Sequence, residues 1–328
     1  MGLLLSVPGG RVPGTALSKE HPLAERLSPA ERQQLISKWK SPSTDAEAAR
    51  QARAERMVKD AIALHPAFYD VRGDLKVEAK GSYPNNTNVR FDSDVDIKVQ
   101  LNDQIYYEFR DDVPVWSRDE IGSYRGRWTP ALLRQEVGKA LVNAFGSGVE
   151  DSHNVAFYVP PVFGSRPNAD VVPCFQYRQY ITGDLSKYHS GSIVHCRDGK
   201  RIVNWPELQL TNGRAKNSDT GNRYKFVVRV LKSVENDLCR QGLIEAVPSY
   251  FSECLIYNVP NSRFTSGESF DSTVAYALAS VFAQLKNGAA DMWEPNEVKK
   301  LFGPEQKWTE DIARDLILKA FDYLGYDE

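Results

Sequence analysis

Two aspartates separated by one residue, Asp94 and Asp96, stand at the start of a stretch with the alternating pattern of a β-strand. Because successive side chains of a strand point to opposite faces, both carboxylates are expected on the same face. Neighbouring carboxylates repel each other, and a bound divalent cation relieves that repulsion. Hard cations such as Mg²⁺ bind one or two protein carboxylates together with phosphate oxygens of a substrate. The pair therefore predicts a metal site for chemistry at phosphate groups.

Two further features strengthen this interpretation. Gly81-Ser82, ahead of the pair, offers a close backbone approach and a hydroxyl that suit a phosphate group. Asp170 is a lone acid in an apolar stretch, and a buried carboxylate without a partner is costly. A D-x-D pair alone is more often a solvated edge strand or a turn. Together the features favour three carboxylates that hold two metal ions, one for a sugar hydroxyl and one for a triphosphate.

The elements that must position these residues follow from capping signals and periodicity. Capping boxes at Ser28 and Thr44 predict a short helix to about Lys40 and a long helix to Leu64. Period-two alternation predicts strands at 75–80, 93–101, 104–109, 154–159 and 168–177, and a hairpin of 193–195 with 201–203. Helical patterns follow at 130–145, 219–241, 249–258, 271–287 and 309–324. This order predicts an α+β core followed by a C-terminal helical domain.

Length, charge and cysteine usage exclude several classes of protein. The chain has 328 residues, with 41 Lys and Arg against 43 Asp and Glu, and a formal net charge of −2. At about 150 residues per domain, the length suggests two domains or one large one. The balanced charge argues against a protein that mainly grips long DNA or RNA, because phosphate binding needs a basic excess. No apolar stretch approaches the roughly 20 residues that span a bilayer. The four cysteines form no C-x-x-C pair, which is typical of reduced thiols in a cytoplasmic protein.

The arrangement of a glycine-serine pair, an aspartate pair and a distant third aspartate resembles the polymerase-β-type nucleotidyltransferases. The fuller pattern, G-S-Y at 81–83, T-N-V-R at 87–90 and S-D-V-D-I at 93–97, resembles the bacterial cGAS/DncV-like nucleotidyltransferases. These are the cyclic oligonucleotide synthases of anti-phage signalling operons (CBASS). N-G-R-A-K-N at 212–217 resembles the family's loop before its long helix, and 249–260 resembles a segment of its C-terminal domain. The resemblance covers most of the chain, but not residues 1–26.

The resemblance implies a fold and a set of catalytic residues. A polymerase-β-like core, with a mixed sheet and flanking helices, would occupy residues 1–215 together with the N-terminal helices. A helical domain, residues 216–328, would close the nucleotide cleft. Asp94 and Asp96 would bind two Mg²⁺ or Mn²⁺ ions. Asp170 would complete the second metal site and help to deprotonate the attacking hydroxyl. Gly81 and Ser82 would hold the donor triphosphate.

The resemblance also implies three nucleotide-binding residues in the helical domain. Lys232 and Ser249 would contact phosphates, and Tyr250 would stack on a base. From the residues alone, Lys232 shares a helix face with Lys225 and Arg229, which fits a solvated basic face as well. Tyr250 has the alternative of a core aromatic.

The product implied by the resemblance is a cyclic dinucleotide, made from two nucleoside triphosphates with release of pyrophosphate. Asn204 stands where related pyrimidine users place an Asn, and its amide can pair with a uracil edge, so we expect UTP with ATP or UTP. An Asn that simply ends a strand before Trp-Pro fits equally well. Alternatives are a purine cyclic dinucleotide, a cyclic trinucleotide, a linear oligoadenylate-synthase-like enzyme, and a non-catalytic nucleotide-binding module. Retention of all three aspartates argues against the last.

The expected partners follow from the same comparison. We expect nucleoside triphosphates as substrates, no long nucleic-acid activator and no membrane. The family implies a separate effector protein that senses the product, and we expect the enzyme itself to be a monomer.

Overall fold

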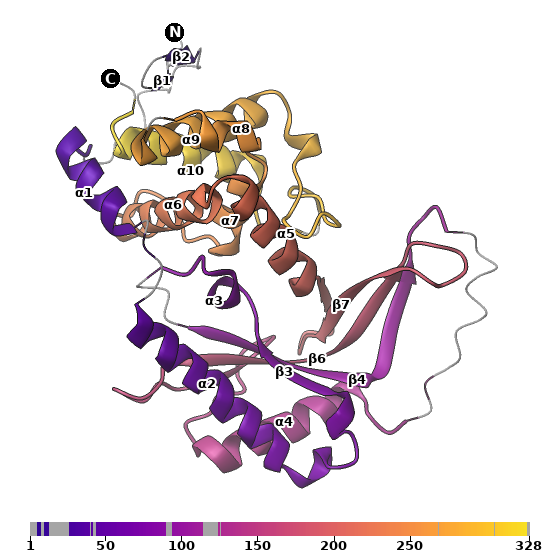
Figure 1. Cartoon of the computed structure of the whole chain (residues 1–328). Coiled ribbons are helices and arrows are strands. Elements are labelled where there is room, and N and C mark those ends of the chain that lie inside the picture. Colours follow the sequence, from indigo (N-terminus) through magenta and orange to yellow (C-terminus); the bar gives the residue numbers. More distant parts are fainter. Residues whose placement is uncertain are drawn as a thin grey trace. The chain divides into compact units, whose positions relative to one another are not determined.

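The computed structural model describes residues 5–7, 10–12, 26–39, 41, 44–89, 94–113, 124, 126–267, 269–304 and 306–326 (Figure 1). Ser93, predicted to begin a strand, and most of the N-terminal arm lie outside these residues. The chain forms two compact units. We call residues 43–84 and 90–208 the sheet unit, and residues 1–42, 85–89 and 209–328 the helical unit. No helix within the described ranges is long and apolar enough to cross a membrane.

The sheet unit is built on a mixed sheet. Its strands, within the described residues, are β3 Leu75–Ala79, β4 Val95–Phe109, β5 Phe157–Val159, β6 Ala169–Tyr180, β7 Tyr188–His195 and β8 Arg201–Asn204. They are ordered β3-β4-β6-β7-β8, with β5 also paired to β6. The strands β4 and β6 run parallel, and the other neighbours run antiparallel. The expected α+β core with a mixed sheet is therefore confirmed.

Two helices cover one face of this sheet. Figure 1 shows α2 (Asp45–Leu64) and α4 (Pro130–Phe145) lying together against it. The fully buried Val95, Ile97, Val99 and Leu101 of β4 alternate along the strand, so they share one face and form the core. The residues between them must point to the opposite face. Short 3₁₀ turns, Pro66–Phe68 and Arg72–Asp74, connect α2 to β3.

The strand β4 is longer than the sequence pattern predicts. The two expected strands, 93–101 and 104–109, are one strand, so that prediction is wrong. The register with β6 pairs Leu101 with Phe175 and then Ile105 with Gln176, which places a bulge between them. A bulge leaves residues unpaired and interrupts the alternation without ending the strand.

The helical unit packs around a single central helix. The central helix is α6 (Arg223–Arg240). The other helices of this unit in the described residues are α1 Pro29–Trp39, α5 Pro206–Asp219, α7 Tyr250–Tyr257, α8 Asn261–Thr265, α9 Phe270–Lys286 and α10 Glu310–Tyr323. The first residues of α5 belong to the sheet unit. A 3₁₀ turn, Ala289–Asp291, follows α9, and β1 (Leu5–Val7) pairs with β2 (Gly10–Val12). The helices α1, α7, α8, α9 and α10 all contact α6. This arrangement confirms the expected C-terminal helical domain.

Capping signals placed the helix starts correctly. Thr44 accepts a hydrogen bond from the backbone of Glu47, whose carboxylate in turn accepts one from the Thr44 backbone at 2.7 Å. Ser28 and Glu31 make the same reciprocal pair before α1. These bonds satisfy backbone donors that a helix start leaves unpaired.

The segment 212–217, expected as a loop, lies inside α5, so that prediction is wrong. Asn212-Gly213 suggests a turn when only local propensity is considered. In the structure Gly213 is buried, and a Cβ there would lie 3.5 Å from the Asn85 side-chain oxygen. The contact is an ordinary van der Waals one, and the glycine lies within a helix and not in a turn.

Candidate active site

Asp96 and Asp170 lie side by side on neighbouring strands. The parallel register of β4 and β6 pairs Asp96 directly with Asp170, and β5 flanks Asp170 on the other side through Tyr158. Both carboxylates are half-buried. Asp94, which comes just before β4 and is exposed, is two residues from Asp96 and so belongs to the same face. The sheet thus brings together the three acids singled out by the sequence.

The glycine-serine pair approaches the same carboxylate. Gly81 has φ 75°, and a Cβ built on it would lie 2.9 Å from Asp96 Oδ2. The backbone N–H of Lys80 donates to the carbonyl of Asp96 at 2.9 Å. Ser82 follows as the first residue of α3 (Ser82–Asn85). A side chain at position 81 would strain this turn and force the Asp96 carboxylate to shift.

The electrostatics of Asp170 reflect crowding of negative charge. Burial raises the pKa of Asp170, and the charges of Asp96 and Asp94 raise it further. His153 and Lys80 act in the opposite direction as smaller contributions. The site therefore holds more negative charge than its neighbouring side chains compensate.

The donor set fits a hard divalent cation. Three carboxylates on one sheet face provide the oxygen ligands that Mg²⁺ and Mn²⁺ prefer, and their mutual repulsion would be relieved by such an ion. The metal-binding geometry is not preformed, because no three His, Cys, Asp or Glu side chains of the described residues are already placed to hold an ion. The carboxylate ligands suit a hard cation chemically, but their side chains would have to move closer together to bind one.

The same sheet face carries two polar residues that sequence reasoning missed. Lys98 is 3% exposed, and its ammonium lies 3.3 Å from Glu78 Oε2 and 3.8 Å from Glu207 Oε1. Its Nζ also donates to Gln100 Oε1 at 3.4 Å. Both residues continue the every-second-residue pattern that begins at Asp94, and that alternation was the signal available in the sequence.

The remaining candidate of the sheet unit is Asn204, the last residue of β8. It is exposed and pairs with Ser192 in the register of β7 and β8. Its side chain has no hydrogen-bond partner among the residues that the structure describes. The amide is therefore available to a ligand.

The helical unit holds the other three candidates, Lys232, Ser249 and Tyr250. Lys232 lies on α6 and is 2% exposed. Ser249 directly precedes α7 and does not cap it through its side chain. The Tyr250 hydroxyl donates to Glu294 Oε2 at 3.2 Å, and its ring packs edge-on against Trp308. Burial raises the pKa of Tyr250. These contacts fit the alternative of a core aromatic, while base stacking stays a prediction.

The basic residues next to Lys232 on α6 do not form a solvated face. Lys225 and Arg229 are both buried, and the Arg229 guanidinium donates to the carbonyl of Asn86 at 2.7 Å. Burial lowers the pKa of Lys225 and lowers that of Arg229 to about 10. The alternative of a solvated basic face is therefore wrong for these two residues.

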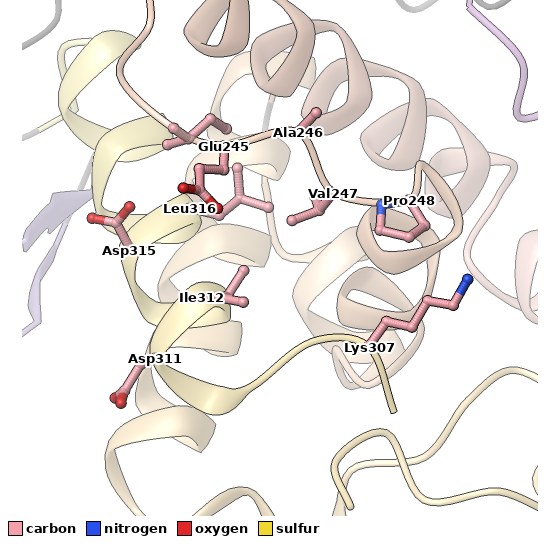
Figure 2. Close-up of a pocket in the computed structure, with 10 residues that line it drawn as sticks. Glu245, Ala246, Val247, Pro248, Lys307, Asp311, Ile312, Asp315 and Leu316 are labelled. Carbon is pink, nitrogen blue, oxygen red and sulfur yellow. The ribbon is translucent and has the colours of Figure 1, made fainter. Parts of the chain in front are cut away.

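The helical unit also contains a cavity of about 400 Å³. It lies between the segment 244–248 and the residues around the start of α10, including Lys307 and Leu316 (Figure 2). Apolar side chains of Val247 and Ile312 and the acids Asp311 and Asp315 contribute to its walls. None of the candidate site residues lines this cavity.

No disulfide joins the four cysteines, as expected; they are Cys174, Cys196, Cys239 and Cys254. Three of them are buried, and Cys239 is partly exposed. Burial raises the pKa of the Cys174 thiol to about 11, which leaves it protonated and unreactive at neutral pH.

Comparison with known proteins places this site in a family. Residues 211–325 match the model of the cGAS/DncV-like nucleotidyltransferase C-terminal helical domain. The chain is 35% identical to a cyclic dipyrimidine nucleotide synthase, CdnE, of Legionella pneumophila, over 89% of this chain and 97% of the relative. It is 33% identical to a cyclic dipurine nucleotide synthase of Elizabethkingia meningoseptica, over 90% of this chain and 98% of the relative.

A solved structure shares the fold at similar coverage. The CdnE c-UMP-AMP synthase of Rhodothermus marinus, with Apcpp and Upnpp, superposes with a TM-score of 0.73 and 30% identity. The match covers 90% of this chain and 95% of that one. With its carboxylates in register on β4 and β6, the chain belongs to the cGAS/DncV-like nucleotidyltransferases and is an enzyme of nucleotidyl transfer.

Proposed function

We propose that this enzyme is a cyclic dinucleotide synthase that joins two nucleoside triphosphates by metal-dependent nucleotidyl transfer. The observation that carries the proposal is the pairing of Asp96 with Asp170 on parallel strands, with Gly81 packed against Asp96. The relatives from Legionella and Elizabethkingia, both named as cyclic nucleotide synthases, support ring closure in place of a linear product. Family membership supports a divalent cation in general, and the oxygen-only ligand set favours two Mg²⁺ or Mn²⁺ ions.

In the proposed reaction, Asp94, Asp96 and Asp170 hold the metal ions. When bound, such ions neutralise the triphosphate and the departing pyrophosphate. The turn at Gly81 and the hydroxyl of Ser82 hold the phosphates of the donor. A ribose hydroxyl oxygen bonds to the donor's α-phosphorus while the bond from that phosphorus to the pyrophosphate oxygen breaks. The hydroxyl proton passes toward Asp170, and a second transfer between the joined nucleotides closes the ring.

The helical unit would supply the remaining nucleotide contacts. Lys232 and Ser249 are proposed to contact phosphates, and Tyr250 to contribute one face of a base site. The burial of Lys232 supports this assignment. Its ammonium makes no ion pair with the residues that the structure describes, and a buried ammonium needs a negative partner.

The base preference is proposed to include uracil, with UTP and either ATP or UTP as substrates. The support is the exposed and unpartnered amide of Asn204, which offers one donor and one acceptor to a uracil edge. The Legionella relative is named for a dipyrimidine product and the Elizabethkingia relative for a dipurine product, at similar identity. Replacing Asn204 by Ser therefore tests the assignment. We expect a lower kcat/KM for UTP with purine turnover retained, whereas unchanged UTP use would refute it.

The experiment that tests ring closure labels each triphosphate in turn at its α-phosphate, in a mixture of all four with Mg²⁺. After phosphatase treatment, a cyclic dinucleotide keeps the label from both of its nucleotides, because both α-phosphates lie in phosphodiester bonds. A linear dinucleotide loses the label of its 5′ nucleotide. Retention of both labels is the expected result, and loss of one of them would establish the linear alternative.

We also propose that the enzyme acts in the cytoplasm as a monomer and that a separate effector protein senses its product. Membership in the family supports the effector, and the free cysteine thiols support a reducing compartment. Light scattering at increasing protein concentration tests the monomer. A mass that stays at 36.9 kDa is expected, and a doubling would contradict it.

A further inference from the structure

The stretch between the two catalytic motifs belongs to the helical unit. The chain leaves the sheet unit after Pro84 and returns to it at Arg90, and residues 85–89 pack among the helices. Asn85 and Thr87 of this stretch are 2% and 0% exposed. Ser82 precedes the stretch by three positions along the chain, and Asp94 follows it. Whatever fixes residues 85–89 therefore fixes the chain directly after the phosphate-binding turn, because Ser82 and Asn85 belong to the same short helix, α3.

A single buried carboxylate on α7 holds this stretch. Glu253 is 1% exposed and accepts from Asn85 Nδ2 at 3.0 Å on Oε1 and from Thr87 Oγ1 at 2.9 Å on Oε2. Gln209 of α5 donates a third bond, to Oε1 at 3.2 Å. Hydrogen bonds to a buried charged group are among the strong ones, and removing a partner leaves a costly unsatisfied group.

The stretch is also held from a second helix. Asn86, between the two bonded residues, has φ 55°, the left-handed conformation, which asparagine adopts more readily than other residues with a side chain. Its carbonyl accepts a hydrogen bond from Arg229 on α6 at 2.7 Å. A segment needed only as a connection would not require three hydrogen bonds from two helices.

We propose that Glu253 is a positioning residue for nucleotidyl transfer, acting through Asn85 and Thr87 on the placement of Ser82 at the other end of α3. The inference rests on the proposed function and adds to it a residue that touches neither metal nor nucleotide. The hydrogen bonds that Glu253 accepts from Asn85 and Thr87 therefore affect the rate of transfer. The hydrogen bond that it accepts from Gln209 affects only the stability of the fold.

The two kinds of bond to the same carboxylate provide a matched comparison. Thr87→Val removes the hydroxyl and keeps the shape, whereas Gln209→Leu removes a bond to Glu253 that lies outside the stretch. We expect both variants to melt at lower temperature than the wild type. Only Thr87→Val is expected to lose kcat, by tenfold or more with KM for the triphosphates little changed, since displacements of about 1 Å can cost roughly 100-fold in rate.

Conservative replacements supply a second readout. In Glu253→Gln, an amide oxygen can still accept from Asn85 and Gln209, and its NH₂ can donate to the Thr87 hydroxyl. Most of kcat should therefore survive in Glu253→Gln and be lost in Glu253→Ala. Thr87→Ser keeps the hydroxyl and should behave like the wild type. Should Thr87→Val fail to fold, Asn85→Leu removes the other bond from the stretch and is measured in the same way.

The outcomes separate this inference from the function on which it rests. Wild-type enzyme without any cyclic product would refute the proposed function itself. If the wild type is active and both Thr87→Val and Asn85→Leu keep wild-type kcat below their melting temperatures, the positioning role of Glu253 is overturned. The proposed function is not affected by that result. Equal losses of kcat in Thr87→Val and Gln209→Leu would also overturn the positioning role, because the effect would then be one of general stability.

Discussion

Asp170 carries a charge that its own surroundings disfavour. Burial and the neighbouring carboxylates of Asp96 and Asp94 raise its pKa, so in the metal-free protein the ionised form is less favourable in the folded state than in the unfolded state. Clustered carboxylates of this kind lower the free energy of unfolding, which an apolar residue at the same place would not do. The cost is recovered when a cation binds to the folded form.

Replacing Asp170 by Asn should therefore stabilise the metal-free protein while abolishing activity. Because the folded pKa is raised, the penalty is present at neutral pH, shrinks as the pH falls through the raised pKa, and vanishes below the ordinary pKa of 3.8. Melting curves in EDTA should show Asp170→Asn above the wild type at pH 7, with the two converging toward acid pH. A lower melting temperature for Asp170→Asn at pH 7 would contradict the crowding of charge at the site.

Asp184 offers a control with the opposite sign. Hydrogen bonds from Thr182 and Ser186 lower the pKa of this exposed carboxyl to about 2, so its stabilising effect is present above pH 4 and is lost as the pH falls through 2. Asp184→Asn should lower the melting temperature slightly at pH 7, without changing activity or the response to Mg²⁺.

The chemistry-bearing residues were accessible to sequence reasoning because their spacing carries geometric information. Asp94 and Asp96 share a face by the period of a strand, and the lone Asp170 in an apolar strand required a partner. Glu253 was not accessible in this way. It lies among apolar residues of a helix, and its bonds to Asn85 and Thr87 join parts of the chain that no local pattern connects.

At the level of elements, the turn between β3 and β4 has little space for variation. Gly81 is in a left-handed conformation and faces Asp96 Oδ2, whereas Gly199, with φ 82° in the turn between β7 and β8, faces open space. Alanine at either position strains the backbone by about 1 kcal/mol or more. Only at Gly81 does the added methyl group also displace the Asp96 carboxylate.

This contrast predicts different outcomes for two similar substitutions. Gly81→Ala and Gly199→Ala should lower the melting temperature by similar amounts. Gly81→Ala should lower kcat by tenfold or more, given that small displacements of catalytic groups are costly, whereas Gly199→Ala should keep wild-type kcat. Activity measured well below both melting temperatures decides the matter, and full activity of Gly81→Ala would show that Asp96 tolerates the displacement.

Elements with local signals were predictable, and those set by tertiary contacts were not. The capping boxes before α1 and α2 and the hairpin of β7 and β8 are encoded within a few residues. The segment 212–217 of α5 was missed because Asn212-Gly213 has turn propensity, whereas the structure buries Gly213 inside a continuous helix. The bulge in β4 is defined only by its register with β6, so the sequence of β4 alone suggested two strands.

For the whole molecule, the balance of charge limits the mode of regulation. With 41 basic and 43 acidic residues, the chain lacks the basic excess that binding of long nucleic acid requires. Several of its cations are also buried, among them Lys98, Arg229 and Lys232. The path of the chain, with residues 85–89 placed among the helices, is another property of the whole molecule that no local pattern could predict.

We therefore expect product formation without any DNA or RNA activator. The rate at low salt should be unchanged by double-stranded DNA, double-stranded RNA or prior nuclease treatment of the enzyme. A rate that depends on added duplex, and falls steeply with salt, would contradict this expectation.

The carboxylates of Asp94, Asp96 and Asp170 are proposed to perform metal-dependent ring formation. A direct comparison sets wild-type enzyme against the double variant Asp94→Ala, Asp96→Ala, each incubated with α-labelled triphosphates and Mg²⁺ and then treated with phosphatase. We expect a cyclic product from the wild type that EDTA abolishes, and none from the double variant at an unreduced melting temperature. Cyclic product formed by the double variant at the wild-type rate would contradict this proposal.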